Sequence, residues 1–215
     1  MLIDLHANPG DLDPQAFAKR VYDAGLGGAV VARTHVAGDL TPWLSALEDL
    51  DLAGFAGVTL ELEKGRLVFL PDDWEGEFAE TDWTPPEGNV WTWEDAKAKA
   101  DAIGGALFAS HPYDRSSAAP ADAIYKFKDV DGVAVRSMAE RSGWDRLAEA
   151  AARTLGAAFI GSSGGDPARI GVAGTVVDDE IMTEPELVQA IKDGLTFVIE
   201  FEPTDNRKDR DPPRP

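Results

Sequence analysis

The sequence contains no cysteine, which excludes disulfides, thiolate metal sites and cysteine nucleophiles. Basic residues are also scarce: 20 Lys and Arg face 39 Asp and Glu, so the formal net charge is −19. This balance argues against nucleic acid or an anionic membrane as the main partner, because both are bound by clustered Lys and Arg. No apolar run approaches the roughly 18 residues of a membrane span, and Asp4 interrupts the N-terminal segment before it resembles a signal peptide. We therefore expect a cytoplasmic protein.

The chain does contain enough apolar residues for a packed core. Its 215 residues are 44% hydrophobic, which suits one globular domain. Short apolar runs alternate with amphipathic stretches, and this alternation predicts an α/β fold with parallel strands joined by helices. The expected strands are 1–5, 28–32, 55–62, 66–70, 106–109, 132–135, 157–160 and 196–201. The expected helices are one from Asp13-Pro14 to Gly25, and 41–50, 92–103, 144–155 and 184–192.

Residues 72–95 interrupt this alternation. They hold nine acidic residues, no basic residue and four of the six tryptophans. We call this segment the acidic Trp loop. Exposed tryptophans surrounded by acids would suit a protein partner with a basic surface. In the alternative interpretation, the tryptophans fold back over the domain and only the acids face water.

The three histidines of the chain occupy similar places in the predicted fold. His6, His35 and His111 each follow a predicted strand, as does the small-residue loop 161–165. Folds of this class carry their functional groups at the carboxyl ends of the strands. The histidines are therefore either the remains of a metal or phosphate site, or unrelated surface and cap residues.

Four sequence blocks resemble the PHP family, the polymerase and histidinol phosphatase domains. They carry, in order, an opening Asp-Leu-His, a second strand ending in His35, a Ser-His-Pro where the family has Ala-His-Pro, and a glycine-rich loop followed by Ile-Gly. The blocks are Asp4–Asn8, Asp23–His35, Thr92–Pro112 and Gly161–Gly171. The resemblance covers about residues 1–202 and implies a PHP-like distorted (β/α)7 barrel. We expect residues 203–215 to be a disordered tail.

The resemblance also implies a cluster of two or three metal ions that hydrolyses phosphate esters in active members. Such a cluster needs many His, Asp and Glu ligands, because neighbouring divalent ions repel one another. At the matching positions this sequence has other residues: Asn8, Thr34, Thr59, Ser163 and Gly165. Asn, Thr and Ser can form hydrogen bonds, but they are poor substitutes for charged ligands.

Two functions remain open from the sequence. The first is a degenerate PHP-like domain that lacks the full metal site and serves as a binding, regulatory or structural module. The alternative is a metal-dependent phosphoesterase with a reduced site, in which His6, His35 and His111 hold one Zn or Mn ion. Glu61, which shares a strand face with Thr59, or Asp166 would then act as base or fourth ligand. The cofactor is accordingly either none or a single divalent metal.

Two weaker site hypotheses concern the same predicted rim. The hydroxyls and amides of Ser162 and Ser163 could surround a phosphate, with charge supplied by Arg33, Arg115 and Arg169. His111 could act as a general base near Asp114, or it could simply bond to a backbone carbonyl at the strand exit. The sequence contains no Gly-x-Ser-x-Gly motif, so we expect no serine hydrolase.

Overall fold

One continuous sheet organises the protein. The structure is a computed structural model that describes residues 1–35, 39–86, 90–113, 119–136 and 142–201. In these ranges nine strands form a sheet in the order β7-β6-β5-β4-β3-β2-β1-β8-β9. The strands are β1 (Leu2–Ala7), β2 (Gly28–Thr34), β3 (Ala53–Leu62), β4 (Gly65–Pro71), β5 (Gly105–Ser110), β6 (Gly132–Arg136), β7 (Ala158–Gly161), β8 (Ala173–Val176) and β9 (Phe197–Glu200). The helices are α1 (Pro14–Asp23), α2 (Thr41–Glu48), α3 (Glu77–Glu80), α4 (Trp93–Ile103), α5 (Ser142–Leu155) and α6 (Glu184–Lys192), with 3-10 turns at Ala121–Lys126 and Pro167–Arg169.

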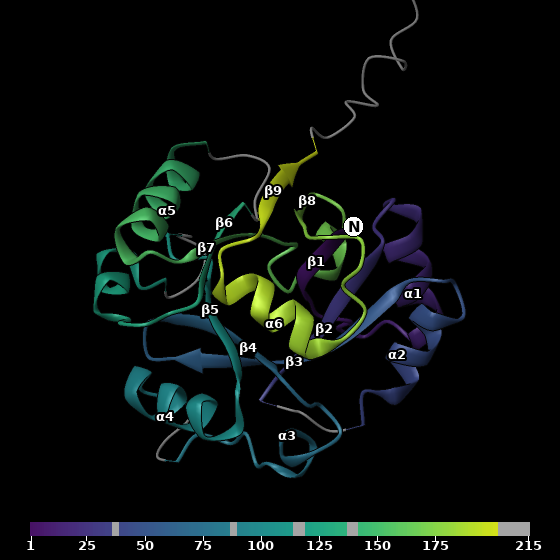
Figure 1. Cartoon of the computed structure of the whole chain (residues 1–215), viewed down its shortest axis with the longest axis horizontal. Helices are drawn as coiled ribbons and strands as arrows, with labels where there is room; N and C mark the ends of the chain where they lie inside the picture. The colour runs from purple at the N-terminus through teal and green to yellow at the C-terminus, as the bar shows by residue number, and fades with distance from the viewer. Residues whose placement is uncertain (36–38, 87–89, 114–118, 137–141, 202–215) are drawn as a thin grey trace, which may run out of the picture.

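The sheet curls until its two ends come close to each other (Figure 1). The Thr175 hydroxyl on β8 donates to the carbonyl of Gly161 on β7, at 2.9 Å. The Thr196 hydroxyl, just before β9, donates to the carbonyl of Phe159 on β7, also at 2.9 Å. These side-chain bonds bridge the seam where the end strands meet. The predicted α/β barrel class is therefore confirmed, as a nearly closed barrel whose sheet has nine strands in the described residues.

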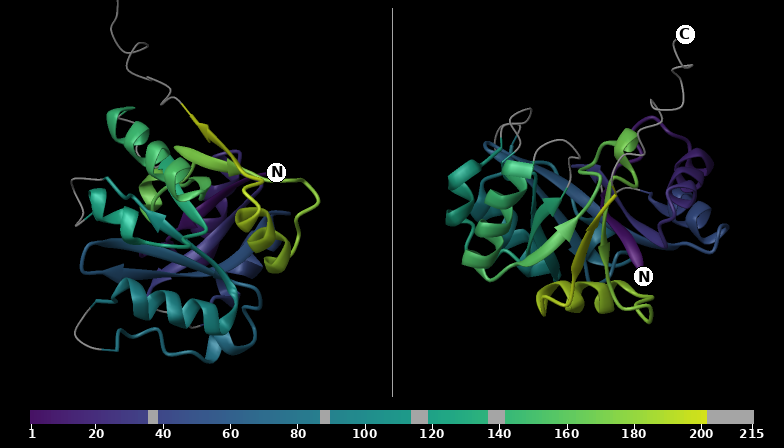
Figure 2. Two further views of the ribbon diagram at one scale, coloured as in Figure 1. Left: turned by 60° about the vertical axis from the view of Figure 1, so that its left-hand side comes forward. Right: turned by 90° about the horizontal axis from the view of Figure 1, so that it is seen from above.

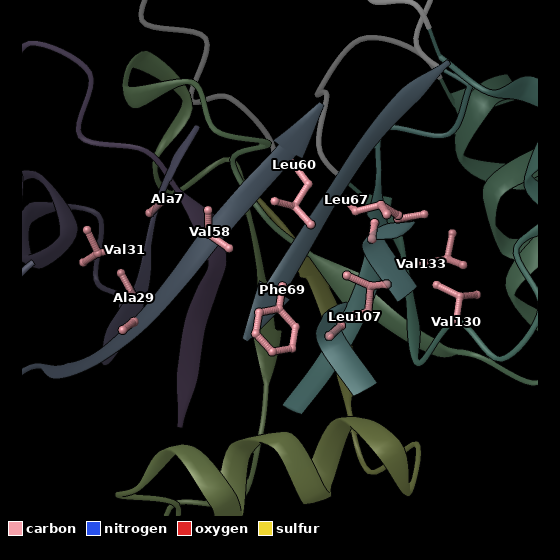
Figure 3. Packing of buried hydrophobic residues seen from close by; sticks show 14 of the residues in the cluster. Ala7, Ala29, Val31, Val58, Leu60, Leu67, Phe69, Leu107, Val130 and Val133 are labelled. Atoms are coloured by element: carbon pink, nitrogen blue, oxygen red, sulfur yellow. The ribbon is translucent and has the colours of Figure 1, made fainter. Parts of the chain in front are cut away.

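Each face of the sheet carries its own apolar core. Strand β3 shows the alternation that a two-residue period requires: Val58 and Leu60 join the core under α1, α2, α4 and α5, whereas Phe55 faces the barrel interior. Figure 3 shows the outer core around Leu60, Phe69 and other side chains from neighbouring strands.

Helix α6 closes one end of the barrel. Leu187, Val188 and Ile191 are buried and pack with the interior side chains of the strands. The helix lies across the end where the parallel strands begin (Figures 1 and 2). The other end, where those strands finish, carries polar side chains, and it is the end at which functional groups were predicted.

The helix starts follow the capping residues expected from the sequence. Asp13 accepts a hydrogen bond from the Ala16 amide at 2.8 Å, and Pro14 occupies the first turn of α1. Thr92 caps α4 in the same way through the Asp95 amide, at 3.0 Å. Local side-chain chemistry thus fixes these starts.

Two expectations about the strands were wrong. Not all strands are parallel, since β4 runs antiparallel to both β3 and β5, and β8 runs antiparallel to β1. Only Glu63 and Lys64 separate β3 from β4, and a connection this short can only form a hairpin. The strand at Ala173–Val176 was not predicted, because four small or β-branched residues carry too little alternation to be recognised.

The acidic Trp loop packs against the barrel where the structure describes it. Trp83 is 1% exposed and Trp91 is 2% exposed, and the Trp83 ring centroid lies 5.2 Å from that of Phe69 on β4. This is the arrangement of the alternative interpretation, in which the tryptophans fold back. A partner that approached this loop would not meet Trp83 or Trp91.

The predicted tail, 203–215, lies outside the described residues, and so does the end of the predicted domain at residue 202. Among the described helices none combines the length and the apolar character needed to cross a bilayer.

Candidate functional site

The polar end of the barrel is formed where β1, β2, β3, β5, β6 and β7 finish. His6 lies near the end of β1, His35 follows β2 directly, and His111 follows β5 directly. The fold therefore brings the three predicted histidines to the same end of the barrel. It also adds Thr59 of β3 and Ser110 of β5, whose side chains point into the same interior layer as His6.

His6 links three strands across the barrel interior. Its Nδ1 lies 2.9 Å from the Ser110 hydroxyl, and its Nε2 lies 3.0 Å from the Thr59 hydroxyl. The ring is 1% exposed. Burial first, and then the proximity of His111 and Arg66, lowers the pKa of His6 well below its usual value. The imidazole is therefore neutral, with one nitrogen donating to a hydroxyl and the other accepting from one.

Asp4 is the second buried polar group of this end. Its Oδ1 accepts hydrogen bonds from the amides of His6 and Ser163, each at 3.0 Å. Burial raises its pKa to about 6, even though the bonds from Ser163 and His6 oppose that shift. Its Oδ2 is buried and has no hydrogen-bond partner. Asp4 thus ties β1 to the loop that follows β7.

The loop at 161–165 uses its amides within the protein. The amide of Ser162 donates to the Arg136 carbonyl at 3.0 Å, and the amide of Ser163 donates to Asp4. The amide of Gly164 donates to the Ser162 hydroxyl at 3.3 Å, and the amide of Gly165 donates to the His6 carbonyl at 2.8 Å. The Ser163 hydroxyl donates to the same carbonyl at 2.9 Å. A phosphate held by this loop would have to displace these bonds.

The two described arginines proposed to neutralise a phosphate each contact another side chain. Arg33 lies over the Trp43 ring, 5.3 Å from its centroid. Arg169 pairs with Asp166 at 3.2 Å. Arg115, like Asp114, falls outside the described residues. The phosphate-site hypothesis therefore stays a prediction from the sequence.

His111 is held by the glycine-rich loop. Its Nε2 lies 2.8 Å from the carbonyl oxygen of Gly164. A carbonyl only accepts hydrogen bonds, so this nitrogen carries the proton and has no lone pair to offer a metal. The backbone of His111 has a φ of 49°, in the left-handed region. The contact matches the alternative in which His111 bonds to a backbone carbonyl at the strand exit.

His35 and Glu61 lie on neighbouring strands of the same end. Burial lowers the pKa of His35, although the charge of Glu61 opposes the shift. Both ring nitrogens of His35 are buried without a hydrogen bond of normal geometry, and the Trp83 backbone lies near enough to favour the charged ring. The Glu61 carboxylate pairs with Arg66 on β4 at 3.1 Å. The predicted catalytic carboxylate thus already has a cationic partner within the sheet.

These side chains do not fit the multinuclear cluster implied by the resemblance. In the described part of the chain, no three His, Asp or Glu side chains are grouped so that they could hold a metal ion. The donor chemistry agrees, because both nitrogens of His6 face hydroxyls and Nε2 of His111 is protonated. Asn8 turns back to accept a bond from the Gly10 amide at 3.0 Å. The rings of His6 and His111 are 6.3 Å apart between centroids.

Two glycines show how tightly the imidazoles fill this space. A Cβ added to Gly164 would lie 1.8 Å from Cε1 and Nε2 of His111, and one added to Gly165 would lie 2.8 Å from Nε2 of His6. Gly165 stands where the family resemblance places a histidine ligand. In this protein a side chain at that position would collide with His6. The glycine at this position and the placement of the His6 imidazole are therefore coupled.

Sequence reasoning missed the two hydroxyl partners of His6. Thr59 was noted only as a substitution for a metal ligand, and Ser110 was not singled out. Both lie on strands separated from β1 in the sheet, so only the curvature of the barrel brings them to His6. Asp4, as part of the opening block, was also given no role of its own.

Comparison with known proteins supports the fold. No family model and no curated protein matches the sequence. A solved structure from Bifidobacterium adolescentis, of a protein assigned as a metal-dependent phosphoesterase, is similar with a TM-score of 0.60 at 14% identity, over 88% of this chain and 94% of that one. An amidohydrolase from Chromobacterium violaceum, solved with bound sulfate and no metal, is similar with a TM-score of 0.62 at 13% identity, over 92% and 97%.

The fold is that of phosphoesterase-type and amidohydrolase-type barrels. At these identities the likeness concerns the fold alone, and the activities belong to the two neighbours. What this chain does has to be argued from its own residues.

Proposed function

We propose that this protein is a divergent PHP-like domain that works without the multinuclear metal cluster of PHP phosphoesterases. In this proposal its barrel serves as a binding, regulatory or structural module. Two solved structures of phosphoesterase and amidohydrolase type share its fold, which supports the hydrolase-like ancestry. The residues at the polar end of the barrel support the change of role.

One observation carries the proposal: His6, at the position of the first family ligand, is used as a link between strands. It bonds to Thr59 and Ser110 at 3.0 and 2.9 Å and is buried and neutral. A metal ligand needs an available lone pair, and its other nitrogen usually donates to a fixed acceptor outside the coordination shell. Here Thr59 stands where the resemblance implies a bridging carboxylate, and its hydroxyl forms a hydrogen bond with Nε2 of His6.

The remaining buried polar groups support the same interpretation. Asp4 binds two backbone amides, and His111 donates to a carbonyl. These contacts join β1, β5 and the loop after β7, so they stabilise the end of the barrel. Side chains whose hydrogen-bonding groups are engaged within the fold in this way are not positioned around a bond to be hydrolysed.

The test combines metal content with activity on generic phosphate esters. The untagged chain is purified without chelator, and its Zn, Mn and Fe are measured by elemental analysis. Hydrolysis of p-nitrophenyl phosphate and bis(p-nitrophenyl) phosphate is then followed with and without added Zn or Mn. We expect well under one equivalent of metal, no metal-induced shift of the melting temperature, and no turnover above that of buffer.

The opposite result would restore the reduced phosphoesterase. One equivalent of metal or more, with turnover that disappears in His111→Ala and His35→Ala, would overturn the proposal. Metal-free turnover lost in the same variants would overturn it too. Glu48→Gln, on the exposed end of α2, is the control variant and should leave any such activity unchanged.

A further inference from the structure

A surface at the other end of the barrel has apolar side chains in solvent. Nine large hydrophobic residues are exposed in the described part of the chain, and five of them lie in the last fifth of it: Met182, Leu195, Phe197, Ile199 and Phe201. Phe197 is 73% exposed and Leu195 is 63% exposed. Phe197 and Ile199 alternate along β9, so they share one face of that strand, and Phe201 follows the strand at its other end.

A groove begins at this apolar face. It has a volume of about 550 Å³ and runs between α6, the segment after β8 and the start of β9. Val177, Ile181 and Ala190 are nearly buried and form its floor, while Leu195 and Phe197 stand along it. We call it the α6–β9 groove. Figures 1 and 2 show that α6 and the start of β9 lie side by side here.

Acidic side chains border the α6–β9 groove, and local bonds fix two of them. Asp178 accepts a bond from the Glu180 amide at 3.0 Å. Glu186 accepts bonds from the amides of Met182 and Thr183, each at 3.0 Å, in the capping box of α6. Those bonds lower the pKa of Glu186, which keeps it ionised. Asp193, at the C-terminal end of α6, is the third acid that lines the groove.

In the described part of the chain, no basic side chain lines the groove. Lys192 is the single basic residue of α6, and it does not line the groove. Its charge favours the ionised form of Asp131. The described lining of the groove therefore combines an apolar floor with three acidic side chains. A molecule that covers the groove would therefore need both apolar and basic groups.

From these observations we propose that the α6–β9 groove docks an amphipathic, basic peptide segment of another protein. Its apolar side chains would cover Leu195 and Phe197, and its Lys or Arg side chains would face Asp178, Glu186 and Asp193. A helix laid in an apolar groove is a common mode of peptide recognition. A second copy of this chain is the poorer occupant, because each copy carries a net charge of −19 and would bring the same acids to the interface.

The docking surface is separate from the polar end of the barrel. Val176 and Val177 lie beside the start of β1, through the Leu2–Val176 pair and the bond from the Val177 amide to the Met1 carbonyl at 2.9 Å. His6 lies near the other end of that strand. The docking proposal can therefore be tested independently of the proposed function.

The experiment uses two labelled synthetic peptides and the full chain. The first peptide is an amphipathic helix of 18 residues with Leu on one face and Lys on the other, and the second has Glu in place of every Lys. Fluorescence anisotropy at 50 mM NaCl should show saturable binding of the Lys peptide alone. Raising NaCl to 300 mM should weaken that binding severalfold, because the charge contacts are exposed.

Matched variants assign the binding to the groove. Leu195→Ser with Phe197→Ser should weaken binding at least tenfold, whereas Leu147→Ser, at another exposed leucine, should not. Asp178→Asn with Asp193→Asn should reduce the salt dependence, whereas Asp11→Asn with Glu48→Gln changes the same net charge elsewhere and should not. Both altered groove residues of the first pair are largely exposed, so the variants should fold, and urea unfolding verifies this.

Four outcomes would overturn the proposal. Equal binding of the Glu peptide would remove the charge argument, and Lys-peptide binding that survives the Leu195 and Phe197 changes would place the site elsewhere. Light scattering that shows a dimer, lost in the Phe197→Ser variant, would make a second copy the occupant. Absence of any binding by the Lys peptide also counts against the proposal.

Discussion

At the scale of single residues, His6 is a buried histidine that two side-chain hydrogen bonds hold in place. The imidazole forms two hydrogen bonds, to hydroxyls on β3 and β5. A neutral, buried imidazole with both nitrogens satisfied adds stability without bringing charge into the barrel. Thr59 and Ser110, opposite the ring, each present a hydroxyl that can donate to or accept from an imidazole nitrogen.

We predict that His6→Ala lowers the free energy of unfolding by about 3 kcal/mol, because it leaves two buried hydroxyls without partners and opens a cavity. Thr59→Val should cost about 1 to 3 kcal/mol, since it removes one bond and keeps the shape. Urea unfolding of the two single variants and the double variant should show costs smaller than additive, because both changes remove the same bond. If His6 served only to bind metal, His6→Ala would leave the stability of metal-free protein unchanged.

Gly164 gives a second prediction at this scale. Gly164→Ala should be strongly destabilising, because the new Cβ would lie 1.8 Å from the His111 ring and the residue has a φ of +71°. His111→Ala should recover part of the loss when it is combined with Gly164→Ala. Gly25→Ala is the control: its φ is +72° with nothing within 4 Å of the new Cβ, so it should cost only about 1 kcal/mol. Equal costs for the two glycines, measured by thermal unfolding, would contradict the packing argument.

At the scale of elements, the acidic Trp loop is attached to the barrel through α4. The ammonium of Lys99 lies 5.5 Å from the ring centroid of Trp83 and 5.4 Å from that of Trp91, and it also donates to the Asp82 carbonyl. One cation therefore holds two tryptophans of the loop. This accounts for the packing of those side chains onto the domain despite the charge of the segment.

We predict that Lys99→Met lowers stability by about 0.5 to 2 kcal/mol, because it keeps the length of the side chain and removes the cation. Lys97→Met is the matched control on the same helix, since Lys97 pairs with the exposed Asp101 and not with a ring. Chemical unfolding followed by tryptophan fluorescence should show the larger change for Lys99. A larger effect at Lys97 would contradict this role of Lys99.

The seam between α5, β6 and β9 depends on one arginine. Arg136 pairs with Glu149 at 2.6 Å and with Glu200 at 3.3 Å. Asp145 is half-buried beside this group, and burial, reinforced by Glu200 and Glu149 against the opposing effect of Arg136, raises its pKa to about 6. The Arg136 guanidinium thus pairs with two carboxylates and lies near a third.

The raised pKa of Asp145 gives a pH-dependent prediction. A carboxyl that titrates near 6 when folded and near 3.8 when unfolded destabilises the fold increasingly as pH rises between these values. Asp145→Asn should therefore stabilise the protein at pH 8, and the gain should shrink as pH falls toward 4. Urea unfolding of both proteins at several pH values measures this difference. A gain that grows toward low pH would contradict it.

At the scale of the whole molecule, net charge opposes the compact state. A charge of −19 on 215 residues causes self-repulsion, which salt screens. We predict that the melting temperature rises when NaCl is increased from 50 mM to 500 mM. Sodium sulfate is an unsuitable substitute, because it also strengthens apolar burial. A fall of the melting temperature in NaCl would mean that the attractive ion pairs dominate.

The two ends of the barrel differ in what they offer to other molecules. The polar end uses many of its buried donors and acceptors internally, as His6 and the loop at 161–165 show, although Asp4 Oδ2 has no hydrogen-bond partner there. The end closed by α6 exposes apolar side chains beside acids. The proposed module would thus contact its partner on the face opposite the one used by catalytic barrels.

The sequence by itself determined the elements whose signals are local. Asp13-Pro14 and Thr92 predict the starts of α1 and α4 because capping involves residues within one turn. The three histidines were placed at one end because each follows a strand. The strand–helix alternation predicted parallel strands, whereas the short turn before Gly65, between β3 and β4, allows only an antiparallel pair.

Only the tertiary structure decided what those histidines contact. The bonds of His6 to Thr59 and Ser110 span 53 and 104 positions in the chain, and they exist because the sheet curls. Whether the tryptophans of the acidic Trp loop face solvent or the barrel was open for the same reason. Local patterns depend on a few neighbouring residues, whereas these contacts depend on the closure of nine strands around a common interior.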